Sequence, residues 1–426
     1  MNRRRLQSVV VRLACLVCGL VLLWPLTPWE AGPRFVVETS PLVAICASII
    51  NRAAGLTAGV GILFGIISIF KKRWYCRFIC PTGLLLEGFS HIGLKKQSWW
   101  SRIPPICQYA SAITLMGAVI GYPVFLWMDP LAIFGSPFAI PVAGDLVSGI
   151  LAGFIIAILL PLTLLSGGIW CGRLCPLGGF QDQAAGLRPF ITGGIRTLYI
   201  WLTTPPRRRG KLTRARRAFL ASAAGIALGF LGRKEGLARA DTEDALLRPP
   251  GAVPEEQFAG VCIRCGNCTA ACPSGIIKPD LTAQGGFSNL LTPTIRYDGR
   301  DYCLEDCNLC TQVCPSGALQ NLDLDTKNRY IIGEALVDFS ICLLTLGKKE
   351  CDVCVVACPY KAIDIVWDDN ACLSYPGVDP KKCNGCGSCE IACPTGDVRA
   401  ISVWALLTEN TEDGKIIEAK KFLEKT

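Results

Sequence analysis

The sequence predicts an α-helical membrane domain of four spans plus a short fifth apolar segment, followed by an α+β domain built around cysteines. Three observations indicate this. Long apolar stretches recur through residues 1–206. The charge reverses, from 26 Lys and Arg against 7 Asp and Glu in residues 1–240 to 17 against 27 in residues 241–426. Of the 25 cysteines, 17 follow residue 240. We expect three parts: residues 1–206, 207–240 and 241–426.

Four apolar stretches approach the length needed to cross a hydrocarbon core of about 30 Å. They are Leu13–Leu26, Ala53–Phe70, Ile106–Trp127 and Leu146–Leu165. A shorter run, Leu42–Ile50, fits a re-entrant or interfacial segment. The alternative is a set of buried helices in a large soluble protein, which the length and number of these runs disfavour.

Basic residues flank the apolar stretches at the N-terminus and in residues 71–105 and 171–217, whereas residues 128–145 carry two aspartates and no base. The positive-inside rule places the basic flanks in the cytoplasm of a bacterial inner membrane. Membrane topology thus accounts for the positive charge, and we expect lipid rather than nucleic acid as a partner.

Residues 207–240 have the pattern of a twin-arginine signal or anchor. Arg216 and Arg217 precede an uncharged run, Ala218–Gly232, which is 15 residues long and about 22 Å as a helix. Small residues at Ala238 and Ala240 resemble a cleavage site. Such a segment predicts that residues 241–426 are periplasmic. A basic cytoplasmic linker with a short interfacial helix is the alternative, and cleavage after Ala240 stays open.

Four cysteine motifs follow one another in residues 241–426, each ending in C-x3-C-P. Three thiolates of a tight loop bind three irons of a cubane, and in two-cluster ferredoxins the fourth cysteine ligates the neighbouring cluster. The candidate ligands are Cys262, Cys265, Cys268, Cys272, Cys303, Cys307, Cys310, Cys314, Cys342, Cys351, Cys354, Cys358, Cys383, Cys386, Cys389 and Cys393.

These sixteen cysteines predict four [4Fe-4S] clusters in two ferredoxin-like pairs. We expect a nested pairing, first motif with fourth and second with third, and a helix starting at each fourth cysteine. Zinc ribbons lack the C-x3-C-P ending, and a disulfide framework would not repeat one pattern four times. Cys342 precedes Cys351 by an unusual gap, which resembles a loop insertion. Cys372 fits no set and is expected to be a buried apolar residue.

The membrane part contains its own repeat. Trp74-Tyr75-Cys76-Arg77-Phe78-Ile79-Cys80-Pro81-Thr82-Gly83 and Ile169-Trp170-Cys171-Gly172-Arg173-Leu174-Cys175-Pro176-Leu177-Gly178 both read W-(x0–1)-C-x3-C-P-x-G. Cysteines four apart share a helical face, so two such faces would offer four thiols. An additional iron–sulfur or thiolate metal site, a thiol–disulfide relay and simple packing all remain open.

The single histidine, His91, excludes an intrinsic haem, because a membrane cytochrome b needs two histidines per haem and no C-x2-C-H occurs. His91 is either a proton-transfer group near a quinone headgroup or a solvated loop residue. The chain also lacks a nucleotide-binding loop.

The two C-x3-C-P motifs and their spans resemble the NapH family, with relatives in NosR-type and MauN-type proteins. Residues 207–426, with the twin arginine and the Cys342 gap, resemble NapG/MauM ferredoxins. The resemblance implies a fusion that takes electrons from membrane quinol and passes them to a periplasmic redox partner, such as a cytochrome c or a reductase. No cysteine lies between Cys175 and Cys262, so the cytoplasmic two-cluster segment of NapH-like proteins is absent and no route between the two halves is apparent.

The expected function is therefore membrane-anchored iron–sulfur electron transfer, with quinol dehydrogenase as its enzymatic form. Two rivals remain: electron flow from a periplasmic dehydrogenase into the quinone pool, and electron supply for maturation or regulation of a metalloenzyme. A third arrangement keeps the clusters in the cytoplasm.

Overall fold

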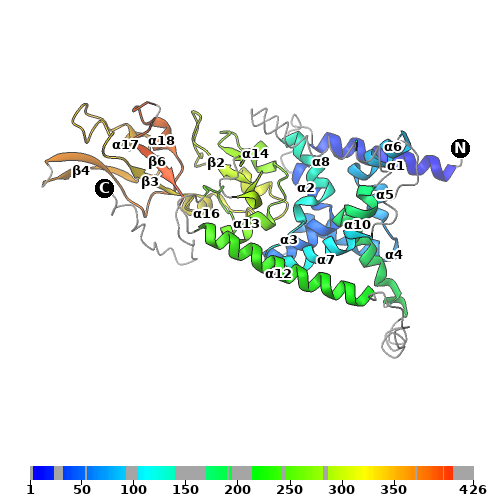
Figure 1. Cartoon of the computed structure of the whole chain (residues 1–426). Helices are drawn as coiled ribbons and strands as arrows, with labels where there is room; N and C mark the ends of the chain where they lie inside the picture. Colours follow the sequence, from blue (N-terminus) through cyan, green and yellow to red (C-terminus); the bar gives the residue numbers. More distant parts are fainter. Residues whose placement is uncertain are drawn as a thin grey trace. The chain divides into compact units, whose positions relative to one another are not determined.

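A computed structural model describes residues 3–23, 32–52, 55–92, 104–139, 161, 169–189, 191–193, 214–240, 246–281, 286–369, 372–396 and 398–405. The chain divides into two compact units (Figure 1). The first contains Met1–Gly236, Glu256–Asn267 and Pro315–Ala318, and the second contains Leu237–Glu255, Cys268–Cys314 and Leu319–Thr426. Two short pieces of the cysteine-rich half thus belong to the helical unit.

In the described part of the first unit, the regular secondary structure is helical. Its elements are α1 (Arg3–Leu23), α2 (Gly32–Glu38), α3 (Pro41–Asn51), α4 (Leu56–Phe70), α5 (Trp74–Phe78), α6 (Pro81–Ile92), α7 (Ile106–Val119), η2 (Leu126–Met128), α8 (Pro130–Ala139), the π-helical η4 (Trp170–Leu174), α10 (Pro176–Gly186) and α12 (Arg214–Ala240).

The apolar helices are shorter than the expected spans. Within the described residues, each helix taken alone falls short of the length and apolarity that crossing a bilayer requires. Among the described helices, one pair, α2 and α3, bent by 97°, has the length and apolar composition of a span when its two helices are taken together. This pair includes the expected re-entrant run. Of the expected fourth span, residues 146–160 and 162–165 lie outside the described residues.

The expected third span, Ile106–Trp127, is helical only to Val119. Gly121 has φ +87°, and the amide of Tyr122 donates to Gly117 O at 2.8 Å, which closes the helix. The chain then turns through η2 into α8. This turn buries Asp129, which accepts hydrogen bonds from Ser40 Oγ at 2.6 Å and from the Leu131 amide at 2.9 Å.

Helix α12 packs on α7 through small residues spaced four apart. Ala221, Gly225 and Gly229 are buried, and a Cβ on Gly225 would lie 2.7 Å from Ile113 O. Such a stripe lets two helices approach closely. The opposite face exposes Phe219, Leu220, Ile226, Phe230 and Leu231. The expected 15-residue apolar run is therefore the middle of a 27-residue helix that includes Arg216, Arg217 and Ala240.

The second unit contains short elements joined by loops. Its helices, together with two that overlap the unit boundary, are α13 (Glu255–Val261), α14 (Asn267–Ala271), η5 (Phe287–Asn289), α15 (Leu309–Gln312), α16 (Leu324–Arg329), α17 (Val353–Ala357) and α18 (Ser388–Ala392). Its strands are β1 (Ile277–Pro279), β2 (Pro293–Ile295), β3 (Glu334–Val337), β4 (Ile363–Asp368), β5 (Leu373–Val378) and β6 (Ile401–Trp404).

The strands form three antiparallel pairs, β1 with β2, β3 with β6 and β4 with β5. Ile277 lies opposite Ile295, Val337 opposite Ile401 and Ile363 opposite Val378. The β3–β6 pair joins residues on either side of the third and fourth cysteine motifs. An α+β arrangement of short hairpins around cysteine loops agrees with the ferredoxin-like expectation.

Candidate iron–sulfur centres

The two C-x3-C-P repeats have the same backbone geometry. The amide of Cys80 donates to Tyr75 O at 3.1 Å, and the amide of Cys175 donates to Trp170 O at 2.8 Å. Each is a wide i→i+5 turn that carries the first cysteine. Pro81 and Pro176 then open α6 and α10, where proline fits because no amide is needed. The two cysteines of a motif thus lie on a turn and on the next helix cap, not on one helical face as expected.

The second cysteine of each repeat directly precedes a helix. The amide of Gly83 donates to Cys80 Sγ at 3.4 Å, and a backbone hydrogen bond from Gly178 lowers the pKa of Cys175 against the larger effect of burial. This is the position at which a side-chain acceptor satisfies a free amide, and the helix N-terminus favours a thiolate. A Cβ on Gly83 would lie 2.8 Å from Cys76 O, and one on Gly178 would lie 3.0 Å from Cys171 O.

The four thiols converge. Burial and then the neighbouring Cys171 raise the pKa of Cys76 to about 12. Burial and then Cys76 raise the pKa of both Cys80 and Cys175 well above the ordinary range. All 25 cysteines lie within the described residues, and none of them forms a disulfide.

Thiolates are ligands of both zinc sites and iron–sulfur clusters. Among the described residues, no group of three His, Cys, Asp or Glu side chains is arranged to hold a metal ion. A cubane spreads its four thiolates over four irons, whereas a zinc site draws them to one centre. Four converging thiols with backbone amides directed at sulfur therefore fit an iron–sulfur cluster.

Two polar side chains bind the repeats together. Arg73, directly before the first repeat, donates to Asp182 on α10 at 2.8 and 2.6 Å and to Cys171 O at 3.1 Å. Gln181 Nε2 donates to Cys76 Sγ at 2.9 Å. Each contact therefore joins one repeat to the other. Sequence reasoning used Arg73 only as a flanking charge and missed Gln181 and Asp182, whose sole signal was a polar run in an apolar helix.

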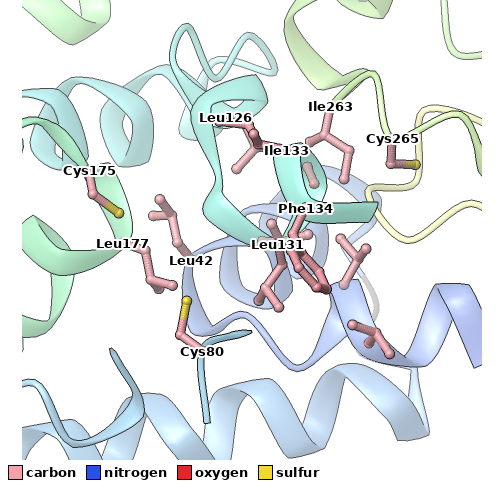
Figure 2. Packing of buried hydrophobic residues seen from close by; sticks show 14 of the residues in the cluster. Leu42, Cys80, Leu126, Leu131, Ile133, Phe134, Cys175, Leu177, Ile263 and Cys265 are labelled. Carbon is pink, nitrogen blue, oxygen red and sulfur yellow. The ribbon is translucent and has the colours of Figure 1, made fainter. Parts of the chain in front are cut away.

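One hydrophobic core connects these thiols to the first ferredoxin motif. Cys80 and Cys175 belong to the same buried cluster as Leu126, Ile263 and Cys265 (Figure 2). Leu42, Leu131, Ile133, Phe134 and Leu177 complete its labelled part. The guanidinium of Arg264 lies 5.5 Å from the centre of the Trp127 ring, a cation–π distance. The loop holding Cys262 and Cys265 is thus packed into the helical unit.

In the second unit, the last cysteine of the first motif lies beside the second motif. Burial raises the pKa of Cys303; Lys327 lowers it, and Cys272 raises it further. Burial also raises the pKa of Cys310, with Cys303 and Cys272 adding to the rise. Cys272 is therefore a neighbour of Cys303 and Cys310, as the fourth ligand of a two-cluster ferredoxin should be.

The third and fourth motifs pair in the same way. Burial raises the pKa of Cys386 to about 12, and Cys358 adds to this rise. Burial raises the pKa of Cys354 to about 11, with Cys351 and then Cys342 contributing, so Cys342 lies beside the rest of its motif. The expected nested pairing is wrong: the fourth cysteine of the first motif lies beside the second motif, and the fourth cysteine of the third motif lies beside the fourth motif.

The fourth cysteines end helices instead of starting them. Helices α17 and α18 terminate at Cys358 and Cys393, because the following proline cannot continue a helix without strain on the preceding residue. Amides beyond the proline turn back to sulfur: Leu319 donates to Cys314 Sγ and Ala362 to Cys358 Sγ, both at 3.3 Å. Amide-to-sulfur hydrogen bonds of this kind fit cluster ligands.

Cys372 and His91 are the two remaining residues for which the sequence led to an expectation. Cys372 is exposed, with φ +50°, so the expectation of a buried apolar residue is wrong; it lies at the start of β5, where the hairpin turns. His91 falls in α6, and its side chain lies outside the described residues.

Comparison with protein families places iron–sulfur domains in both halves. A 4Fe-4S dicluster domain matches residues 261–318 and 349–396, which group the first motif with the second and the third with the fourth. A 4Fe-4S binding domain matches residues 53–99 and 148–193, each containing one C-x3-C-P repeat.

The cysteine-rich half is similar to curated ferredoxin-type proteins. The methylamine utilization ferredoxin-type protein MauM of Methylobacillus flagellatus is 36% identical over 157 residues, covering 35% of this chain and 64% of that protein. The ferredoxin-type protein NapG of Escherichia coli is 37% identical over 182 residues, covering 40% and 74%. MauM of Methylorubrum extorquens is 33% identical over 202 residues, covering 45% and 86%.

The chain spans just under two thirds of the length of the first of these relatives. No solved structure matches the chain.

Proposed function

The chain belongs to the family of ferredoxin-type iron–sulfur proteins that includes NapG and MauM, and on that premise we propose that it is a membrane-anchored electron carrier that oxidises quinol and delivers the electrons to a periplasmic redox protein. The observation that carries the proposal is the single core in which Cys80, Cys175 and Cys265 are all buried. It supports the proposal because Cys265, a ligand candidate of the first ferredoxin motif, lies in the same compact unit as the C-x3-C-P repeats.

The residues present would hold five clusters. Cys76, Cys80, Cys171 and Cys175 would hold one in the helical unit, and the sixteen cysteines of the ferredoxin motifs would hold four. Bound [4Fe-4S] clusters supply one-electron carriers whose potentials depend on hydrogen bonds to sulfur and on solvent exposure. The chain contributes amides directed at Cys80, Cys314 and Cys358, and it buries the membrane repeats among apolar side chains that exclude water.

In the proposed reaction, one quinol donates two electrons, and each acceptor molecule takes one. A quinol that becomes a quinone breaks two O–H bonds and releases two protons and two electrons. The protons go to solvent, and the electrons reduce two equivalents of a one-electron acceptor such as a cytochrome c. Residues 241–426 carry a net negative formal charge, with 27 Asp and Glu against 17 Lys and Arg. This charge favours a basic electron acceptor, and it makes the association of the two proteins sensitive to salt.

Exposed apolar faces support membrane anchoring. Val10 and Val17 on α1, Leu63 on α4, and Phe219 and Phe230 on α12 are each more than half exposed. Apolar surface of this extent on several helices is typical of contact with lipid or another protein. We place the protein in the bacterial inner membrane, as a NapH-like part joined to a NapG/MauM-like part, with the basic flanks cytoplasmic and residues 241–426 periplasmic.

The test is anaerobic reduction of the purified full chain by a short-chain quinol in detergent, followed by electron paramagnetic resonance and iron analysis. We expect about 20 irons per chain, from four irons in each of five clusters, and reduction of a fraction of them by quinol. Cys175→Ser should remove about four irons, whereas Cys372→Ser, the matched control at an exposed cysteine, should remove none. Absence of any quinol-dependent reduction in a fully loaded preparation would refute the proposal.

A second candidate function has one observation in its favour. The MauM relatives are named for methylamine utilization, which suits electron flow from a periplasmic dehydrogenase into the quinone pool. Potentiometric titration separates the two directions: clusters in the last two motifs with potentials below that of the host quinone would favour this reverse flow. A protein that supplies electrons for metalloenzyme maturation would instead show reduced clusters without quinol turnover.

A further inference from the structure

A cavity in the helical unit adjoins the C-x3-C-P site. It lies among α3, α4, α7 and α10 and has a volume of about 380 Å³. Its walls are apolar apart from one side chain, Gln183; Ile45, Ile62, Gly65, Leu115 and Phe180 form much of the lining. The volume falls in the range of roughly 300–1,000 Å³ typical of small-molecule sites, and the apolar walls with one amide suit an amphipathic ligand.

The rim of the cavity is apolar and open. Ile66 and Leu187, which border it, are 49% and 52% exposed. A polar ligand arriving from water would gain little from such a rim, whereas a ligand with a hydrocarbon chain would lay that chain across it. The rim therefore favours a ligand that combines a compact head with an apolar tail.

Gln183 gives the cavity its single polar function. Its Nε2 donates to Gln108 O at 2.5 Å, which fixes the amide plane. A primary amide has a carbonyl oxygen that accepts hydrogen bonds. A hydroxyl group on the ligand head would be an appropriate donor to it, whereas a phosphate or carboxylate head would not.

Helix α10 links the cavity to the thiols. Phe180, Gln183 and Ala184 line the cavity, whereas Gln181 on the same helix donates to Cys76 Sγ, and Cys175 is the helix N-cap. An α-helix with its side chains is about 10 Å across. A ligand in the cavity is therefore separated from the thiol site by one helix.

We propose that this cavity binds the hydroxylated ring and the first isoprenoid unit of a quinol, with Gln183 accepting a hydrogen bond from a ring hydroxyl. The proposal rests on the proposed function, because it names the place where that substrate docks. The competing occupant is a phospholipid acyl chain, which would use the apolar walls without Gln183.

Gly65 offers a way to close the cavity. A Cβ at this position would make ordinary contacts, 3.6 Å from Ile45 Cδ1 and 3.6 Å from Pro41 Cβ, so Gly65→Leu would extend its remaining atoms into the cavity. Gly59 lies on the same helix, is exposed, and has nothing within 4 Å of a Cβ. Gly59→Leu is thus a matched control with the same change of residue.

The experiment is photolabelling of the full chain in detergent with an azido-ubiquinone of short chain length, followed by peptide mapping. We expect label in the α4 and α10 peptides of the natural protein and of Gly59→Leu. Gly65→Leu should lose it, and Gln183→Leu should bind about tenfold more weakly, as the loss of one hydrogen bond implies. Iron content and the resonance spectrum serve as the folding control for every variant.

The outcomes distinguish this inference from the proposed function. The cavity assignment is overturned if the label is found elsewhere in the chain, or if Gly65→Leu is labelled as strongly as the natural protein. It is also overturned if phospholipid prevents labelling as readily as decylubiquinol does. If quinol reduces the iron–sulfur centres of Gly65→Leu as fast as those of the natural protein, the proposed function stands and the cavity assignment is refuted. Specific labelling of the cavity without reduction leaves the site standing and the function refuted.

Discussion

Arg73 and Asp182 are joined by two hydrogen bonds, Nε to Oδ1 at 2.8 Å and Nη2 to Oδ2 at 2.6 Å. Arg73 stands directly before the first C-x3-C-P repeat, and Asp182 lies on the helix that the second repeat opens. Asp182 is 7% exposed and Arg73 31%. A bidentate guanidinium–carboxylate pair fixes both distance and orientation, so this contact holds the two half-sites in register.

Replacing Arg73 should therefore loosen the proposed iron–sulfur site of the helical unit. Arg73→Gln leaves the buried Asp182 with only the longer contact to Lys72 Nζ, at 3.5 Å, and removes the hydrogen bond to Cys171 O. We expect a loss of about 2 kcal/mol in unfolding free energy, a shifted potential for the proposed cluster of the helical unit, and unchanged ferredoxin centres. Arg77→Gln is the control, because Arg77 is exposed within the same repeat. Differential scanning fluorimetry and potentiometry measure the two effects; equal behaviour of both variants would contradict the role of the pair.

The glycine of each repeat should not tolerate a side chain. Because a Cβ on Gly83 would lie 2.8 Å from Cys76 O, Gly83→Ala must shift the turn that carries Cys76, at a cost of roughly 1–3 kcal/mol. Gly178→Ala should act similarly but more weakly, since its contact is 3.0 Å. We expect about four irons fewer per chain in Gly83→Ala. Gly88→Ala, on the same helix with open space around it, should keep full iron content.

Helix α12 should depend on its small-residue stripe. Gly225→Leu places a side chain against Ile113 O, 2.7 Å from the position of its Cβ, and should separate α12 from α7. Ala227→Leu, on the exposed face, should have no such effect. Limited proteolysis in detergent is the measurement: we expect cleavage within α12 only in Gly225→Leu. Protection of both variants would mean that the stripe is not a packing surface.

Stability should fall as pH rises through the titration of Asp129. Burial raises the pKa of Asp129 from 3.8 to about 6. Between these values the folded state binds more protons than the unfolded state, so the unfolding free energy decreases with rising pH, by on the order of 3 kcal/mol in total. Asp129→Asn keeps an acceptor for the Leu131 amide and cannot ionise.

The measurement compares thermal unfolding of the natural protein and Asp129→Asn at pH 4 and pH 7.5. The difference in Tm between the two proteins should favour the natural protein more at the lower pH. Parallel pH profiles would show that Asp129 is ionised without penalty, and so that the pocket around Ser40 is more polar than its hydrogen bonds indicate.

The sequence alone determined the chemistry of the sites. Soft thiolates at C-x2-C-x2-C-x3-C-P spacing suit iron–sulfur clusters wherever they occur, because the short loop limits which sulfurs can surround one cubane. The repeat of W-(x0–1)-C-x3-C-P-x-G singled out Cys76, Cys80, Cys171 and Cys175. It left a metal or iron–sulfur site, a thiol–disulfide relay and simple packing open as their use. Apolar runs located α1, α3, α4, α7 and the middle of α12, although they overestimated the helix that ends at Val119.

Tertiary structure decided which motifs are neighbours. Spacing within a motif says nothing about distances between motifs, so the pairing of Cys272 with Cys303 and of Cys358 with Cys386 required the fold. The same holds for Arg73 with Asp182, 109 positions apart, and for the core that unites Cys80 with Cys265. Local patterns set backbone turns and ligand chemistry, whereas contacts between distant residues depend on how whole helices pack, and packing energies are sums over many side chains that no short motif contains.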